Sequence, residues 1–268
     1  DATAGAGDGG GAGAALTAPV QAMGLSFPSP LVLAAGFDRH GRLLPDGAAL
    51  GLGGVETGSH WTVAEHPPPL HRPLSRSRQR APGAGGARAP RHGLNLVKPP
   101  MLDWARAEHA FRRAIGAWQG GADYLVLNPG RGCPSPWHFV DLVAALSAWC
   151  GRLPRHRPLP LVAKLPASWV EGDGRVDLAR RFVAAGADGL LLSAEGAIAT
   201  ACRRIAELAG ALGPGTCLVS VGGIDSVREA QARLQAGARL LQVHRAVLVA
   251  GARQRRLLAA IAGLRPPA

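Results

Sequence analysis

The segment CLVSVGGIDSVREAQARLQAGARLLQVHRAV, residues 217–247, indicates how the whole chain folds. Residues 217–221 are a short apolar run, typical of a strand buried on both faces, and residues 240–243 are a second one. Between them, Ser226 and Glu229 have the spacing of a helix N-terminal capping box. The segment therefore predicts one strand, helix, strand unit of a parallel sheet.

The same alternation recurs upstream and gives eight strands, which predicts an α/β fold, a closed (β/α)8 TIM barrel in a single domain. An N-terminal hairpin at residues 20–30 is expected to close the bottom of the barrel. The expected strands are residues 31–35, 54–57, 93–97, 124–128, 160–165, 189–192, 217–221 and 240–243. The expected helices are residues 45–52, 103–119, 137–150, 176–185, 198–212 and 253–264, with one more that starts at Ser226 and ends at Gly237.

The amino-acid composition indicates how large a core the chain can form and which charge its binding partners carry. A chain of 268 residues with 47% hydrophobic residues can bury a large core, and 30 basic against 18 acidic residues give a net charge of +12. This excess favours anionic partners. Only Lys98 and Lys164 are lysines, so we expect each to do something that arginine cannot.

Two segments depart from the strand and helix pattern. Residues 1–18 are nearly all Gly and Ala and predict a disordered tail, which leaves residues 19–268 as the barrel domain. Residues 67–92 carry six arginines and no acid in a basic loop without periodicity, compatible with disorder or with a lid.

Cysteine spacing and hydropathy bear on the compartment. Cys133, Cys150, Cys202 and Cys217 have no spacing typical of a metal site or a disulfide framework. No signal segment or membrane span is visible in the sequence. We therefore expect a reduced, cytoplasmic protein without a metal.

The carboxyl ends of the strands are where a barrel of this kind carries its functional residues. Gly222-Gly223 leaves backbone N–H groups open to an anion, and Arg245 after the next strand supplies positive charge. The alternative is a tight turn beside a solvated arginine, but this order of elements favours a phosphate site. Two asparagines and Lys164 favour a flat heterocycle next to the phosphate, whereas a sugar phosphate or an indole phosphate would fit the phosphate site equally well.

With these strand ends the chain resembles the dihydroorotate dehydrogenases, a family of FMN-binding barrels. The similar segments span nearly the whole chain in order: GLSFPSPLVLAAGFDRHG at 24–41, GGVETGS at 53–59, GLNLVK at 93–98, ADYLVLN at 122–128, VAKLP at 162–166, SVGGIDS at 220–226 and AGARLLQV at 236–243. The resemblance implies that FMN is the cofactor.

Carried over by position, the resemblance assigns a role to each strand end. It implies that the isoalloxazine ring is held by Ala34, Ala35, Gly36, Gly58, Ser59, Asn95, Asn128, Lys164, Ser193 and Val221. It implies that the phosphate is held by Gly222, Gly223, His244 and Arg245. Lys164 would stabilise negative charge on the pyrimidine part of the reduced ring.

The residues that would bind the substrate depart from the family. Arg39 stands where the family has a lysine, Ser193-Ala194 stands where it has Asn-Thr, and the basic loop replaces an asparagine-rich loop. The resemblance therefore favours dihydroorotate or a related anionic substrate that the arginines attract.

The loop after the fourth strand, NPGRGCPSPW at 128–137, carries the candidate base. The family has a Ser or Cys before a proline, and here Cys133 precedes Pro134 about two residues late, so that Arg131 takes the family position unless the loop bulges. Arg131 is expected to lower the thiol pKa, although Cys133 fits an inert buried thiol equally well. The candidate catalytic residues are Cys133, Arg131 and Arg39.

Three functions compete at this stage. The first is an FMN-dependent dehydrogenase of pyrimidine biosynthesis, and the second is a repurposed barrel that binds phosphate or flavin without redox chemistry. The third, RNA binding through the basic loop, lacks interleaved aromatic residues and is disfavoured. Nothing before Val20 resembles the membrane-contacting helical pair of quinone-linked members, so we expect a soluble electron acceptor, and a homodimer is compatible with the sequence.

Overall fold

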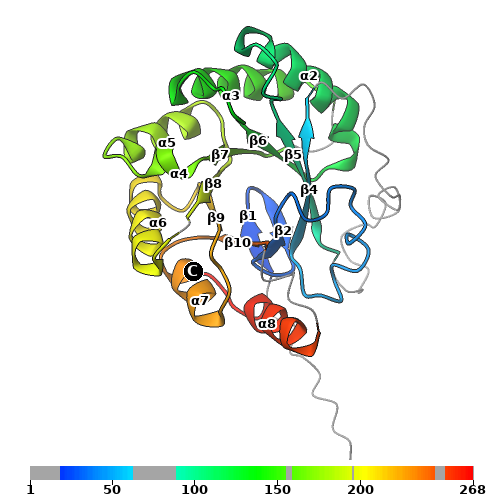
Figure 1. Cartoon of the computed structure of the whole chain (residues 1–268), viewed down its shortest axis with the longest axis vertical. Helices are drawn as coiled ribbons and strands as arrows, with labels where there is room; N and C mark the ends of the chain where they lie inside the picture. The colour runs from blue at the N-terminus through cyan, green and yellow to red at the C-terminus, as the bar shows by residue number, and fades with distance from the viewer. Residues whose placement is uncertain (1–18, 63–88, 155–158, 195, 245–250, 268) are drawn as a thin grey trace, which may run out of the picture.

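The computed structural model describes residues 19–62, 89–154, 159–194, 196–244 and 251–267. Within these residues eight parallel strands close into a barrel in the order β10, β3, β4, β5, β6, β7, β8, β9. Helices surround the ring of strands (Figure 1). The predicted (β/α)8 barrel is confirmed.

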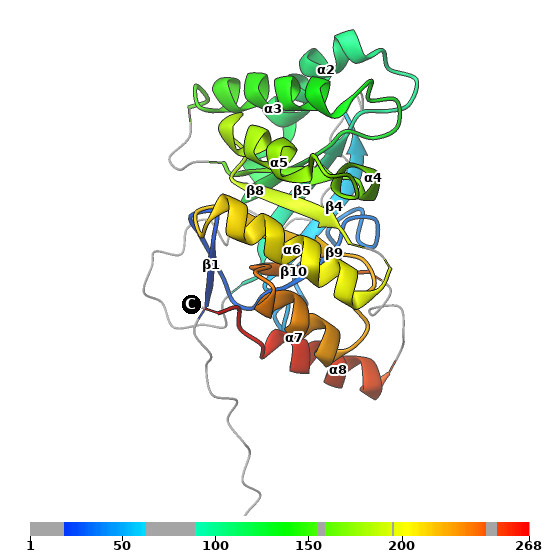
Figure 2. The same ribbon diagram turned by 90° about the vertical axis from the view of Figure 1, so that its left-hand side faces the viewer.

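The strands are β1 Val20–Ala22, β2 Leu25–Phe27, β3 Leu31–Leu33, β4 Gly54–Trp61, β5 Arg91–Val97, β6 Tyr124–Asn128, β7 Leu161–Leu165, β8 Gly189–Ser193, β9 Cys217–Val221 and β10 Leu240–Val243. The helices are α2 Ala107–Trp118, α3 Pro136–Cys150, α4 Ala167–Val170, α5 Arg175–Ala184, α6 Ile198–Leu212, α7 Val227–Gln235 and α8 Ala252–Ala262, with short 3-10 turns at Trp104–Arg106 and Gln119–Gly121. Helices α5, α6, α7 and α8 follow one another along one side of the barrel (Figure 2).

The hairpin β1–β2 packs against the interior of the barrel. Its strands are antiparallel, and Phe27 is fully buried with its ring centroid 6.0 Å from that of Tyr124. The hairpin shares one apolar cluster with inward side chains of the barrel strands, including Val32, Val126 and Val219. The hairpin therefore closes this end of the barrel, as predicted.

The N-terminus of α7 forms where the sequence predicts it. The Ser226 hydroxyl oxygen accepts a hydrogen bond from the Glu229 backbone N–H at 3.2 Å. The Glu229 carboxylate accepts from the backbone N–H of Asp225 at 3.5 Å, one residue before the N-cap, so it contacts the chain entering the helix. The buried side of the helix carries Ala230 and Leu234.

Two expectations about local structure are wrong. Residues 45–52 form successive turns instead of a helix, since their backbone hydrogen bonds reach back three, four or five residues instead of a regular four. Gly51, with φ +74°, lies outside the helical region. The expected basic loop at 67–92 ends too late, since Arg91 already belongs to β5. Residues 1–18 and 63–88, with most of that loop, lie outside the described residues.

Candidate functional site

A cavity of about 550 Å³ lies at the carboxyl ends of the barrel strands. This volume is in the range of cofactor and small-molecule sites. The cavity brings together most of the predicted strand-end residues. Its lining is Ala34, Ala35, Asn95, Lys164, Leu191, Ser193, Gly196, Val221, Gly222, Gly223, Ile224, Asp225, Gln242, Val243 and His244.

The glycine turn after β9 forms one wall of the cavity. Gly222 has φ +97° and Gly223 has φ +66°, a conformation that glycine adopts without steric cost. After β3, two strands away in the barrel, a Cβ atom at Gly36 would lie 3.8 Å from His244 Nε2. The turn and His244 thus border the same space, as expected for an anion site. Arg245, the other half of the predicted phosphate site, lies outside the described residues.

The other wall of the cavity offers hydrogen-bonding groups to a polar ligand. Asn95 is 1% exposed, and its Oδ1 has no hydrogen-bond partner among the described residues. A buried acceptor without a partner is costly, and a ligand N–H can satisfy it. Asn95 therefore fits the edge of a heterocycle.

Beneath the cavity lies a buried carboxylate that the sequence analysis did not single out. Glu56 on β4 is 1% exposed and accepts hydrogen bonds from the Tyr124 hydroxyl, at 3.1 Å, and from the Gln242 amide. Its partners are on β6 and β10, each two strands away, so the carboxyl group lies inside the barrel. Glu56 Oε2 has no hydrogen-bond partner among the described residues.

Burial raises the pKa of Glu56 from 4.5 to about 7. The Tyr124 hydroxyl and the positive charge of Lys164 offset part of this rise. Since Lys164 lines the cavity, the protonation of Glu56 changes the electrostatic potential that a ligand meets there.

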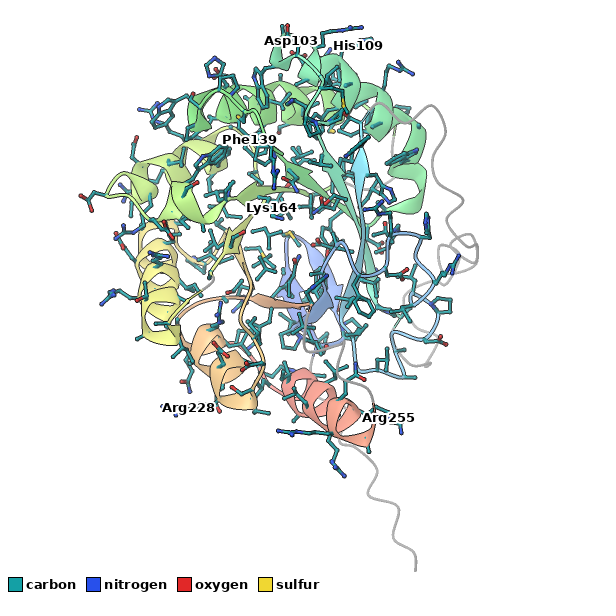
Figure 3. All side chains as sticks on the ribbon, in the orientation of Figure 1. Asp103, His109, Phe139, Lys164, Arg228 and Arg255 are labelled. Carbon is teal, nitrogen blue, oxygen red and sulfur yellow. The ribbon has the colours of Figure 1, made fainter. Side chains whose placement is uncertain are left out.

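The two lysines have different surroundings. Lys164 on β7 is partly exposed in the cavity. It lies inside the ring of strands, whereas Arg228 and Arg255 lie on the outer helices (Figure 3). Lys98 is 1% exposed and donates to the carbonyls of Pro99, at 3.0 Å, and Leu102, at 2.7 Å. Lys98 therefore stabilises the loop after β5, and only Lys164 faces the cavity.

Several predicted cofactor residues do not line the cavity. Asn128 Oδ1 accepts from the backbone N–H of Gly130 at 3.0 Å, so its amide oxygen stabilises its own loop. Gly58 and Ser59 lie where the register of β4 and β5 shifts, between Thr57 and His60. Gly36 lies close by, since its N–H donates to the Gly58 carbonyl at 2.6 Å. Contacts between these residues and a cofactor remain predictions.

The three candidate catalytic residues are not among the residues that line the cavity. Arg39 and Arg131 are exposed, and Cys133 is partly buried, with its thiol donating to the Ser135 carbonyl at 3.1 Å. Burial raises the pKa of Cys133, and the charge that partly opposes this rise belongs to Lys98. The expectation that Arg131 lowers the thiol pKa is therefore wrong, because the exposed guanidinium is screened by solvent.

The sequence analysis missed three buried polar residues, although each had a signal. Gln242 interrupts a strand that is otherwise apolar, and Glu56 is the acidic residue of a strand that is buried along most of its length. Arg233 occupies a position next to Leu234 on the buried side of α7 and is 0% exposed. A polar residue at a position predicted to be buried is informative because its burial requires partners.

No group of three or more His, Cys, Asp or Glu side chains in the described residues is placed to hold a metal ion. Across the same residues, no helix has the length and apolar character needed to cross a membrane.

The fold and the cavity define a class of protein: a (β/α)8 barrel with a polar cavity and a glycine turn at its strand ends. No protein-family model matches the chain. Among curated relatives, the dihydroorotate dehydrogenase (quinone) of Leifsonia xyli is 29% identical over 87% of this chain and 81% of its own length. The protein of that name from a Nocardioides species is also 29% identical, over 87% and 82%. The chain is therefore similar in sequence to the dihydroorotate dehydrogenases over most of its length, in agreement with the resemblance that the sequence analysis found.

Solved structures agree with the fold. A ligand-free dihydroorotate dehydrogenase from Eimeria tenella superposes with a TM-score of 0.72 at 20% identity, covering 91% of this chain and 85% of that chain. A mandelate oxidase variant with a monooxide FMN adduct gives a TM-score of 0.54 at 20% identity, over 92% and 76%. Both similarities support the barrel fold.

Proposed function

We propose that this chain is an FMN-dependent oxidoreductase that oxidises dihydroorotate or a related anionic substrate, as in pyrimidine biosynthesis. The observation that carries the proposal is the cavity, in which Asn95, Lys164 and Gly222-Gly223 converge from strands far apart in the sequence. Curated relatives with the name dihydroorotate dehydrogenase, which align over most of the chain, support the same activity.

The residues present fit FMN. The unpartnered Asn95 Oδ1 is an acceptor for a ring N–H, and the positive φ angles of Gly222 and Gly223 leave room for a phosphate at the backbone. When bound, FMN supplies the hydride acceptor. Lys164 provides positive charge at the cavity wall, and Ser193 provides a hydroxyl group there.

The side chains that bind the substrate in the family are partly replaced here, so the proposal includes related anionic substrates beside dihydroorotate. Where the family has Asn-Thr, Ala194 has its N–H bonded to the Val221 carbonyl and its carbonyl bonded to Arg233. These backbone groups are hydrogen-bonded within the barrel and are not available to a substrate. Of Ser193 and Ala194, only Ser193 lines the cavity. Cys133 is proposed as the base that removes the substrate proton. This role requires its loop to move toward the cavity.

The electron acceptor is proposed to be soluble, in contrast to the quinone in the relatives' names. Anaerobic reoxidation of the reduced protein compares the two. A quinone analogue that reoxidises it much faster than soluble acceptors such as fumarate or NAD would refute this part of the proposal.

The visible absorption spectrum of the purified protein, followed by anaerobic addition of dihydroorotate, tests the main proposal. Flavin bands that bleach would support a dihydroorotate dehydrogenase. Bands that bleach only with another anionic compound would indicate that this compound, and not dihydroorotate, resembles the substrate. A spectrum without flavin bands that added FMN cannot restore would refute the redox function and favour the repurposed barrel. Lys164→Met should retain the bands but bleach more slowly, and Arg228→Met, on an outer helix, serves as the matched control.

A further inference from the structure

Arg233 is a fully buried cation next to the glycine turn. The side chain is 0% exposed, although it belongs to the outer helix α7. A guanidinium group does not lose its proton in a protein, so the charge itself is buried. Burial of a charge is costly unless hydrogen bonds and opposite charge compensate it. Its surroundings therefore indicate what the charge does.

The guanidinium group joins two loops that border the cavity. Nη1 donates to the Ser220 hydroxyl on β9 at 2.8 Å, and Nη2 donates to the Ala194 carbonyl after β8 at 3.1 Å. A Cβ atom at Gly223 would lie 3.5 Å from Nη2. Arg233 thus lies directly behind the glycine turn, on the side away from the cavity.

The neighbouring acids neutralise this charge only in part. Glu229 Oε1 lies 3.5 Å from Arg233 Nη2, while Oε2 of the same carboxylate accepts from the Asp225 N–H. The Asp225 side chain is exposed at the rim of the cavity, where solvent screens it. The Nε of Arg233 has no partner among the described residues.

We propose that Arg233 is a positioning residue for the phosphate of the ligand. It fixes the glycine turn through Ser220 and Ala194, and it adds buried positive charge behind the backbone N–H groups that face the cavity. Electrostatic attraction through such a poorly solvated layer is stronger than in water. Arg233 thereby makes the site selective for a phosphorylated ligand without contact with it. The inference rests on the proposed function, in which the phosphate is that of FMN.

FMN and riboflavin, which differ by the phosphate, separate this role from a purely structural one. The dissociation constants of both are measured on the flavin-free protein by quenching of flavin fluorescence. Arg233→Met should weaken FMN binding about tenfold or more beyond any change for riboflavin, and Arg233→Lys should retain most of the preference for FMN. Arg228→Met, on the exposed side of the same helix, should change neither constant. Equal weakening of both flavins by Arg233→Met would overturn the inference.

A second variant covers the case in which Arg233→Met does not fold. Glu229→Gln keeps a side chain that can cap α7 but removes the charge that partly neutralises Arg233. The preference for FMN over riboflavin should then increase, and a decrease or no change would overturn the inference.

Inorganic phosphate distinguishes a failure of this inference from a failure of the proposed function. If the wild-type protein binds neither flavin, the proposed function fails. The rise in melting temperature with added phosphate then becomes the measurement for the same variants. A smaller rise in Arg233→Met than in Arg233→Lys and Arg228→Met would support the role of Arg233, and equal rises in all three would overturn it.

Discussion

The buried carboxyl group of Glu56 should make the stability of the protein depend on pH. Its pKa is 4.5 in the unfolded chain and about 7 in the folded protein, where it is 1% exposed. Between these values the folded state keeps a proton that the unfolded state releases, so the free energy of unfolding falls as pH rises. Below the lower value and above the higher one, both states have the same protonation and the dependence levels off.

The size of the effect follows from the two pKa values. At about 1.4 kcal/mol per pH unit, the difference between 4.5 and about 7 corresponds to about 3 kcal/mol lost across this range. Glu56→Gln should remove this loss, because a neutral amide of the same shape titrates nowhere in the range. The variant should therefore be more stable than the wild type at about pH 8, where the wild type contains a buried charge.

Urea unfolding at intervals from about pH 5 to about pH 9 measures the dependence. Glu171→Gln is the matched control, because Glu171 is exposed with its nearest ion-pair partner 3.8 Å away. Tyr124→Phe removes a hydrogen bond that lowers the pKa of Glu56 and should move the transition to higher pH. If wild type and Glu56→Gln lose stability in parallel as pH rises, the reasoning is refuted.

Three further predictions concern a packed glycine, the helix N-caps and Cys133. Gly93→Ala would place a Cβ atom 2.7 Å from Glu56 Cγ and should lower the free energy of unfolding by about 1 to 3 kcal/mol, whereas Gly210→Ala, with no atom within 4 Å, should not lower it. Ser226→Ala removes the N-cap hydrogen bond of α7 and should cost about 1 kcal/mol, while Ala197→Asp adds a cap that α6 lacks and should stabilise. Urea unfolding measures both pairs, and a reversed order within either pair would contradict the argument. If Cys133 is the base, Cys133→Ala should slow dihydroorotate-dependent flavin reduction at least about a hundredfold. The wild-type rate should still rise near pH 9, because burial raises the pKa of the thiol. Normal turnover by Cys133→Ala would exclude the role.

Local sequence patterns were sufficient to predict the barrel. Apolar runs such as residues 217–221 and 240–243 form strands at the predicted positions, and Ser226 caps α7 as expected. These features depend on residues a few positions apart, so their physical cause is contained in the pattern itself. The prediction of a helix at 45–52 was wrong because the segment forms turns with irregular hydrogen-bond spacing, which the apolar pattern does not indicate.

The candidate site depended on contacts between strands that the sequence does not specify. The strand-end rule correctly brought Asn95, Lys164 and the glycine turn to one cavity, yet it could not show that Lys98 turns to backbone carbonyls. Nor could it show that the carboxyl group of Glu56 accepts hydrogen bonds from Tyr124 and Gln242, which lie on strands to either side of β4.

The sequence by itself determined the order of elements and the end of the barrel that carries the site, because strand and helix formation follow from local periodicity. Only the tertiary structure decided the protonation of Glu56 and the place of Arg233 behind the glycine turn. Both depend on burial and on partners brought together by closure of the barrel, and electrostatic energies change steeply with those distances and with exclusion of water.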